Sequence, residues 1–320
     1  MLGLVFLGSC LNPHFLLSQH KLYDDLFSVS FPNEKDGWAC GRWGTILRTS
    51  DGGKNWIRQI SGLSLTLTSI CFVDSRNGWT VGDMGIILHT ADGGKTWEKQ
   101  KSPVSYFLMG VYFANSLKGW VVTEWTHILH TEDGGKTWGV QFKDEDYILK
   151  AISFSDSQNG WAVGEYGYIY HTSNGGVSWK KEAGSFGLSE ETGDVVAEPF
   201  LFNVVAIDSQ TAWAVGIDGY VTRTVDGGKT WSPVKTGAPK THLFCVASDR
   251  KETILIGGRG VLLTSIDRGR SWRVPEFKPP ITYGWIYGLA WNGASRNIAV
   301  GWKGAIYESS SINSWQRVNY

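Results

Sequence analysis

The chain contains the octet Thr49-Ser50-Asp51-Gly52-Gly53-Lys54-Asn55-Trp56, and five close copies of this octet follow it. The copies occupy residues 90–97, 131–138, 172–179, 224–231 and 265–272. The final tryptophans of consecutive octets are 41, 41, 41, 52 and 41 residues apart, and a degenerate seventh copy keeps only its tryptophan, Trp315. Self-similarity with a period near 40 residues indicates either a propeller of repeated sheets or an array of helical repeats.

The segments between the octets are rich in β-branched and aromatic residues, and they lack the apolar spacing of amphipathic helices. Each repeat contains four short strand-like runs separated by glycine, which in the first repeat are residues 27–31, 37–41, 45–48 and 56–59. Four strands make one propeller blade. The sequence therefore predicts an all-β fold, a seven-bladed β-propeller with four-stranded antiparallel blades over residues 27–320, preceded by an N-terminal segment of residues 1–26.

The octet is interpreted as a structural turn. Its hydroxyl and carboxylate can accept backbone N–H groups, its glycines supply positive φ, and its tryptophan packs between strands. The acid or amide of the six octets is Asp51, Asp92, Asp133, Asn174, Asp226 and Asp267. The Gly-Gly-Lys-Thr portion lacks the spacing of a phosphate-binding loop and joins strand to strand.

Charge and cysteine content exclude several classes of function. Lys plus Arg and Asp plus Glu number 30 each, so no net field attracts nucleic acid. Cys40, Cys71 and Cys245 fall on different blades at strand positions, and the chain contains no Cys-x-x-Cys pair, which argues against a disulfide or a metal site. The histidines before three octets, His89, His130 and His171, lie on successive blades, too far apart for one metal ion. We therefore expect no metal and no cofactor. We also expect the protein to be a monomer.

The N-terminal segment leaves two interpretations open. An apolar run, residues 2–7, leads into Leu7-Gly8-Ser9-Cys10, which resembles a lipobox with Cys10 as the lipidated residue. The run is short, and no Lys or Arg precedes Lys21, so ordinary sequence is the alternative.

The second turn of each blade is predicted to lie on the face opposite the octets, together with the connections between blades. Two variable residues occupy the tip of each second turn, such as Gly258-Arg259 in blade six, and the large aromatic side chains at four of these tips are expected to be exposed. Aromatic and basic side chains at such tips are typical of protein-binding surfaces. Basic tips fall on blades six, seven and one, which become neighbours when the ring closes, whereas acidic tips fill the other blades; a chance arrangement is the alternative. The candidate partner-binding residues are Arg42, Trp43, Trp125, Tyr166, Arg259, Trp302 and Lys303.

The 52-residue interval carries 11 extra residues, which the repeat places on this same face within residues 184–200. The segment is either a flap that contributes to specificity or a tolerated surface insertion.

The chain resembles the photosystem II stability and assembly factor family, a branch of the Asp-box propellers. The resemblance covers about residues 12–320 and is carried by repeated motifs such as Asn77-Gly78-Trp79-Thr80-Val81-Gly82 and Asp92-Gly93-Gly94-Lys95-Thr96-Trp97. It implies a non-enzymatic scaffold on the lumenal or periplasmic side, lipid-anchored in some members, that holds a reaction-centre subunit through a basic patch. Arg42, Arg259 and Lys303 would be the counterparts of that patch.

A glycan-binding lectin and a glycoside hydrolase are the rival functions, since Asp boxes occur in sialidases and xyloglucan hydrolases. The exposed tryptophans could stack on sugars, but a hydrolase needs two acids about 5–9.5 Å apart. The residues read at the mouth of the inner strands are mostly apolar, with one acid among them: Asp25, Thr66, Phe107, Ile148, Phe200, Thr241 and Trp285. The ring could be closed either by residues 315–318 or by residues 14–17.

Overall fold

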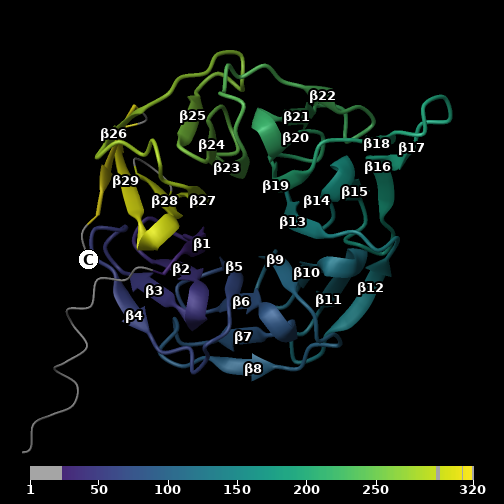
Figure 1. Ribbon diagram of the computed structural model, residues 1–320. Coiled ribbons are helices and arrows are strands. Elements are labelled where there is room, and N and C mark those ends of the chain that lie inside the picture. The colour runs from purple at the N-terminus through teal and green to yellow at the C-terminus, as the bar shows by residue number, and fades with distance from the viewer. Residues whose placement is uncertain (1–23, 293–295, 312, 319–320) are drawn as a thin grey trace, which may run out of the picture.

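The computed structural model describes residues 24–292, 296–311 and 313–318, which form seven sheets around a central axis and one separate two-stranded hairpin (Figure 1). This confirms the predicted seven-bladed propeller. Cys10 and residues 14–17 lie outside the described residues.

The first three strands of every blade are antiparallel neighbours. The innermost strands are β1 (Leu26–Ser30), β5 (Leu67–Phe72), β9 (Leu108–Phe113), β13 (Leu149–Phe154), β19 (Leu201–Ala206), β23 (Leu243–Ser248) and β27 (Ile286–Trp291). The second strands are β2 (Gly37–Gly41), β6 (Gly78–Gly82), β10 (Gly119–Thr123), β14 (Gly160–Gly164), β20 (Ala212–Gly216), β24 (Ile254–Gly258) and β28 (Asn297–Gly301). The third strands are β3 (Ile46–Thr49), β7 (Ile87–Thr90), β11 (His127–Thr131), β15 (Ile169–Thr172), β21 (Val221–Thr224), β25 (Val261–Ser265) and β29 (Ile306–Ser311).

The outer strands are less uniform. Six blades have a fourth strand from their own repeat: β4 (Ile57–Gln59), β8 (Glu98–Gln100), β12 (Gly139–Lys143), β16 (Lys180–Ala183), β22 (Ser232–Pro233) and β30 (Ser314–Arg317). In blade six, the outer segment makes a single bridge, Thr264 to Arg273, before Pro275, which has no N–H to donate. The chain then crosses to blade seven, where β26 (Glu276–Lys278) pairs in parallel with β30. Blade six therefore has three strands and blade seven has five, a departure from the predicted uniform blades.

Seven apolar clusters form the core, each at the boundary between two neighbouring blades. Buried second-strand tryptophans stack flat on a phenylalanine of the next blade, with centroids 3.6 Å apart for Trp38 and Phe72 and for Trp79 and Phe113. Adjacent blades therefore hold each other through large apolar surfaces.

Each octet closes on itself through hydrogen bonds, as predicted. In the second octet, the Asp92 carboxylate accepts the Thr96 N–H at 3.0 Å and the Thr96 and Thr90 hydroxyls at 2.7 and 2.8 Å. The Thr90 hydroxyl also accepts the Gly94 N–H at 2.8 Å. The Thr96 N–H is the main reason that the pKa of Asp92 is lowered to about 2.

The cysteines and histidines named from the sequence occupy repeat positions. Cys40 and Cys245 are buried free thiols, and burial raises the pKa of Cys40 to about 12. Each histidine ring stacks on a buried tryptophan of its own blade, with His171 and Trp161 centroids 4.5 Å apart. No cluster of three metal-ligating side chains occurs within the described residues, and no helix there is long and apolar enough to cross a membrane.

β30 completes blade seven, as expected for residues 315–318, and the alternative closing segment, residues 14–17, lies outside the described residues. β30 pairs with β29 inside blade seven, and blade seven packs directly on blade one. Side chains of both blades, among them Leu26, Ile298 and Val318, share one buried cluster. Ring closure among the described residues is thus side-chain packing between two complete blades.

Candidate partner-binding face

The octets and the second turns lie on opposite faces, as the repeat predicted. The Gly52 N–H donates to the Lys35 carbonyl in the first turn, which places that turn beside the octet. The Gly44 N–H, in the second turn, donates to the Leu65 carbonyl in the connection between blades. We call the face that carries the second turns and connections the tip face.

Six of the second turns are tight hairpin turns with positive φ at both central residues, the geometry of a type I′ turn: η2 (Arg42–Gly44), η3 (Asp83–Gly85), η4 (Glu124–Thr126), η5 (Glu165–Gly167), η6 (Ile217–Gly219) and η7 (Trp302–Gly304). In five of these six turns a glycine precedes the tip and allows close packing, because a Cβ at Gly41 would lie 2.0 Å from the Asp25 carbonyl oxygen; in blade three the residue is Thr123. The first tip N–H then donates to that carbonyl, at 3.0 Å for Arg42.

The second tip residue has left-handed backbone geometry in these six turns. Its φ is 56° at Trp43, 67° at Trp125 and 54° at Tyr166. Glycine, asparagine and aspartate tolerate this region best, and other residues cost about 1–2 kcal/mol there. The backbone geometry of the turn therefore does not explain the three aromatic residues at this position.

Three of the four aromatic tips are exposed as expected, and one is covered. Trp43 is 61%, Trp125 49% and Trp302 39% exposed. Tyr166 is half-buried, because Phe186 and Phe200 pack on its ring with centroids 4.4 and 4.8 Å away. The expected exposure of Tyr166 was wrong, since the extra segment of the 52-residue interval folds over it.

That extra segment, residues 184–200, forms a two-stranded hairpin of β17 (Phe186–Leu188) and β18 (Val195–Ala197). The hairpin begins at the tip face, where the Ser185 N–H donates to the Tyr166 carbonyl, and it extends outward beyond the ring (Figure 1). Leu188, Val195 and Val196 are more than half exposed.

The basic tips of blades six, seven and one do become neighbours. Each cation lies near an aromatic ring: Arg42 lies 5.8 Å from Phe27, Arg259 5.5 Å from Trp285 and Lys303 4.2 Å from Trp302. Arg42 is also paired with Asp25 at 3.1 Å, so its charge is partly compensated.

Asp25, the acid read at the mouth, joins the two blades that close the ring. One carboxylate oxygen accepts the Arg42 Nε–H at 3.1 Å, and the other accepts the Lys303 backbone N–H at 2.9 Å. We call this arrangement the Asp25 clasp. The acidic tips of blades three and four are similarly engaged, since Glu124 and Glu165 accept backbone N–H groups of Phe107 and Ile148.

In blade six, the residue predicted to lie at the mouth of the inner strands was wrong. The residue equivalent to Asp25 there is His242, because the Arg259 N–H donates to the His242 carbonyl; the prediction of Thr241 was one residue early. The second turn of blade six has one tip residue, Arg259 between Gly258 and Gly260, and not the pair Gly258-Arg259. A connection one residue longer compensates, since Leu243 lies 12 residues after Trp231 whereas Leu67 lies 11 after Trp56. The 41-residue spacing therefore conceals the shift.

An aromatic arc around the mouth was not foreseen from the sequence. Each innermost strand has an irregularity in its pairing after its first residue, and the half-buried residue there is Phe27, Thr68, Met109, Lys150, Phe202, Phe244 or Tyr287. The four aromatic members touch in sequence around blades five, six, seven and one, with centroids 5.6, 5.4 and 5.3 Å apart. Aligning the repeats at their first strand residue would have revealed this arc.

The opposite side of the mouth carries a half-buried cation, Lys150. Desolvation lowers the pKa of Lys150, and the nearby Glu165 and Glu124 oppose this effect. The tip face is thus aromatic with basic tips on blades six, seven and one, and more acidic on blades three and four.

The family described as "Photosynthesis system II assembly factor YCF48" matches residues 16–102, 96–197 and 188–318, which together span nearly the whole chain. The chain belongs to this family. The match confirms the resemblance on which the expectation of a protein-binding assembly factor rested.

Solved structures share the fold at low identity. A structure described as "YCF48 bound to D1 peptide" has a TM-score of 0.73 and 19% identity, covering 92% of this chain and 96% of that one. YCF48 from Cyanidioschyzon merolae has a TM-score of 0.71 and 18% identity, with coverage of 91% and 97%. A GH74 xyloglucanase from Xanthomonas campestris has a TM-score of 0.72 and 12% identity, and this chain spans about half of its length. No curated protein matches the chain.

Proposed function

We propose that this member of the YCF48 family is a non-catalytic scaffold that binds a segment of a reaction-centre membrane protein on its tip face. The observation that carries the proposal is the set of aromatic residues held at left-handed tip positions, with Trp43 and Trp125 exposed. Strained positions that keep exposed aromatic side chains are typical of binding surfaces. The D1 peptide bound to the similar YCF48 structure supports a polypeptide partner.

The binding residues are Arg42, Trp43, Trp125, Arg259, Trp302 and Lys303, with Tyr166 supporting the hairpin. The absence of catalysis is part of the proposal. It is supported by the engagement of Asp25, Glu124 and Glu165 in hydrogen bonds that hold the turns, which leaves these carboxylates without the freedom of an acid–base pair.

A binding assay with immobilised D1 peptide tests this function. We expect capture by the wild-type chain at low salt and a loss of at least about tenfold in affinity for the variant Arg42→Gln, Arg259→Gln, Lys303→Gln, because three cations leave the face. Glutamine avoids a repulsion with Asp25 that glutamate would create at position 42. The control, Lys54→Gln with Lys95→Gln, removes exposed octet lysines from the other face.

Equal capture by wild type and the triple variant would refute the basic part of the face. A panel of glycans and fluorogenic glycosides provides the rival readout: binding or hydrolysis lost on Trp43→Ala would favour a lectin or an enzyme over the scaffold.

The proposal places the protein outside the cytoplasm, on the periplasmic or lumenal side, as a monomer anchored through Cys10. Metabolic labelling with a radioactive fatty acid tests the anchor. We expect label on the wild-type chain and none on Cys10→Ser; an unlabelled wild type that stays in the soluble fraction would reject the anchor.

A further inference from the structure

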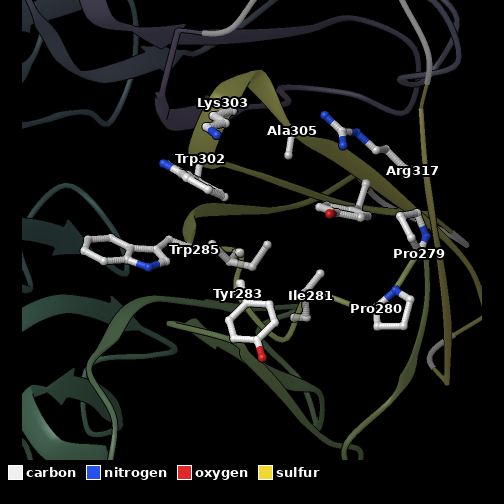
Figure 2. Close-up of a pocket in the computed structure, with 12 residues that line it drawn as sticks. Pro279, Pro280, Ile281, Tyr283, Trp285, Trp302, Lys303, Ala305 and Arg317 are labelled. Atoms are coloured by element: carbon white, nitrogen blue, oxygen red, sulfur yellow. The ribbon is translucent and has the colours of Figure 1, made fainter.

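A cavity of about 290 Å³ opens where the chain passes from blade six to blade seven (Figure 2). One wall is the segment 279–286, which follows β26. The other is the tip of blade seven, Trp302 and Lys303, together with β29 and β30. The cavity exists because the chain leaves blade six early and adds β26 to the edge of blade seven. We call it the blade-seven pocket.

Aromatic rings and prolines form most of its lining. Tyr283, Trp285, Trp302 and Tyr307 contribute rings, and Pro279, Pro280 and Ile281 complete the apolar surface. Trp302 and Tyr283 are 39% and 85% exposed, so their rings are accessible from outside. In Figure 2, the rings of Trp285, Tyr283 and Trp302 lie along one side, with Pro280 and Arg317 on the other.

Two cations accompany these rings. The Lys303 ammonium lies 4.2 Å from the centre of the Trp302 ring, and Arg317 lines the opposite side. Within the described residues, neither side chain is paired with an acidic one. A positive charge without a partner favours an anionic ligand.

The lining also argues against a sugar. Its residues include no Asp, Glu, Asn, Gln, Ser or Thr. Apart from its Tyr hydroxyls, the polar side chains of the lining can only donate hydrogen bonds, so hydroxyls of a buried sugar would lack acceptors, which is costly. An apolar side chain needs none, and the volume is at the small end for ligand pockets, enough for one large side chain.

Resting on the proposed function, we propose that the blade-seven pocket binds one aromatic side chain of an acidic peptide segment, with flanking carboxylates contacting Lys303 and Arg317. The pocket thus supplies the anchor, and the cations fix which peptides are accepted.

Fluorescence anisotropy with labelled synthetic peptides tests the pocket. The probe is Gly-Ser-Asp-Glu-Phe-Asp-Glu-Ser-Gly, compared with a version in which Phe is Ala and one in which every acid is Lys. We expect the first probe to bind, the Ala version to bind at least about tenfold more weakly, and the Lys version not to bind. Raising the salt concentration should weaken the binding of the first probe, because salt screens the attraction between its carboxylates and the two cations.

Two kinds of variant locate the binding. Trp302→Ala removes a ring from the wall, and Lys303→Gln with Arg317→Gln removes both cations. Each change should lower the affinity for the first probe at least about tenfold. Ala305→Phe fills the cavity and should do the same, with circular dichroism melts checking the fold of each variant. Val177→Ser, an 84% exposed side chain in the fourth octet, is the control and should bind like wild type.

The pocket is refuted if the first probe does not bind, if Phe and Ala probes bind equally, or if the pocket variants bind like wild type. Binding of xyloglucan oligosaccharides that Trp302→Ala abolishes, without peptide binding, would also refute it and indicate a glycan site. The D1 peptide assay separates the two proposals. Probe binding without D1 capture supports the pocket and rejects D1 as the partner. D1 capture that Ala305→Phe does not weaken supports the partner and rejects the pocket as its binding site.

Discussion

At the scale of single residues, the octet at position 174 provides an internal control for the role of charge. Asn174 replaces the aspartate of the other five octets, yet it accepts the Ser178 N–H and the Thr172 hydroxyl, both at 2.9 Å. Its amide donates to the Ser178 hydroxyl, whereas Asp92 accepts from Thr96. The turn therefore requires the acceptor oxygen, and the negative charge is secondary.

This comparison predicts how the protein responds to acid. The pKa of Asp92 is lowered to about 2, chiefly by the Thr96 N–H, and that of Asp133 also to about 2, chiefly by the Thr137 hydroxyl. A folded-state pKa below the unfolded value of about 3.9 adds stability above pH 4, which is lost as the pH falls toward 2.

We expect Asp92→Asn to melt close to wild type at neutral pH and to lose less stability than wild type between pH 4 and 2. Asp92→Ala should lose about 1 kcal/mol at neutral pH, as removal of a capping side chain does. Thermal melts at several pH values measure both. A steeper acid loss in Asp92→Asn than in wild type would contradict the assignment.

The sequence was most informative at the residue level where the interaction is local. The octet hydrogen bonds, the glycine-framed turns and the burial of Cys40 and Cys245 follow from residues close in the chain or from comparison of repeats. The packing of the hairpin on Tyr166 and the hydrogen bonds of Asp25 depend on residues that meet only in the folded ring. No local sequence pattern therefore predicts them.

At the scale of elements, the β17–β18 hairpin is the largest departure from the repeat. A two-stranded hairpin has little stability of its own, and the contacts of Phe186 with Tyr166 and Tyr147 hold its base. Its outer part makes no contribution to the clusters between blades.

Replacing residues 187–196 by Gly-Gly should therefore lower the melting temperature by no more than about 3 °C, because no interblade packing is lost. Replacing Phe186 by Ala in the intact chain should raise the solvent exposure of Tyr166 with a similarly small thermal effect. A melt by circular dichroism measures the thermal effect of both changes. A large destabilisation from the deletion would show that the hairpin is part of the core.

Strand assignments also mark where prediction from sequence ends. The repeat places three strands in every blade, because each run recurs at the same distance from its octet. It could not reveal β26, since the parallel pairing of β26 with β30 joins segments from two repeats. The blade-seven pocket was missed for the same reason.

At the scale of the whole molecule, the boundary between blades seven and one joins the two ends of the described chain. Apolar packing and the Asp25 clasp hold it together. The Asp25 side chain is only 13% exposed, so its removal leaves two donors with weakened partners.

Asp25→Ala should therefore destabilise the protein by about 1–3 kcal/mol. The control, Asp218→Ala, removes an exposed tip acid that lies 3.6 Å from His242, and should cost less than about 1 kcal/mol. Urea unfolding compares the two variants. An equal effect would mean that the clasp does not contribute to ring closure.

Among the residues that the structure describes, this boundary is held by packing, with no strand donated across it, and this has a further consequence. Apart from β26, each blade is built from one uninterrupted stretch of chain, and the break in covalent continuity between blades seven and one could be moved to another boundary. A circular permutant that starts at β5 and ends with β4, its old termini joined by a flexible linker, should adopt the same toroid. Two separately expressed fragments cut at such a boundary should reassemble by complementation.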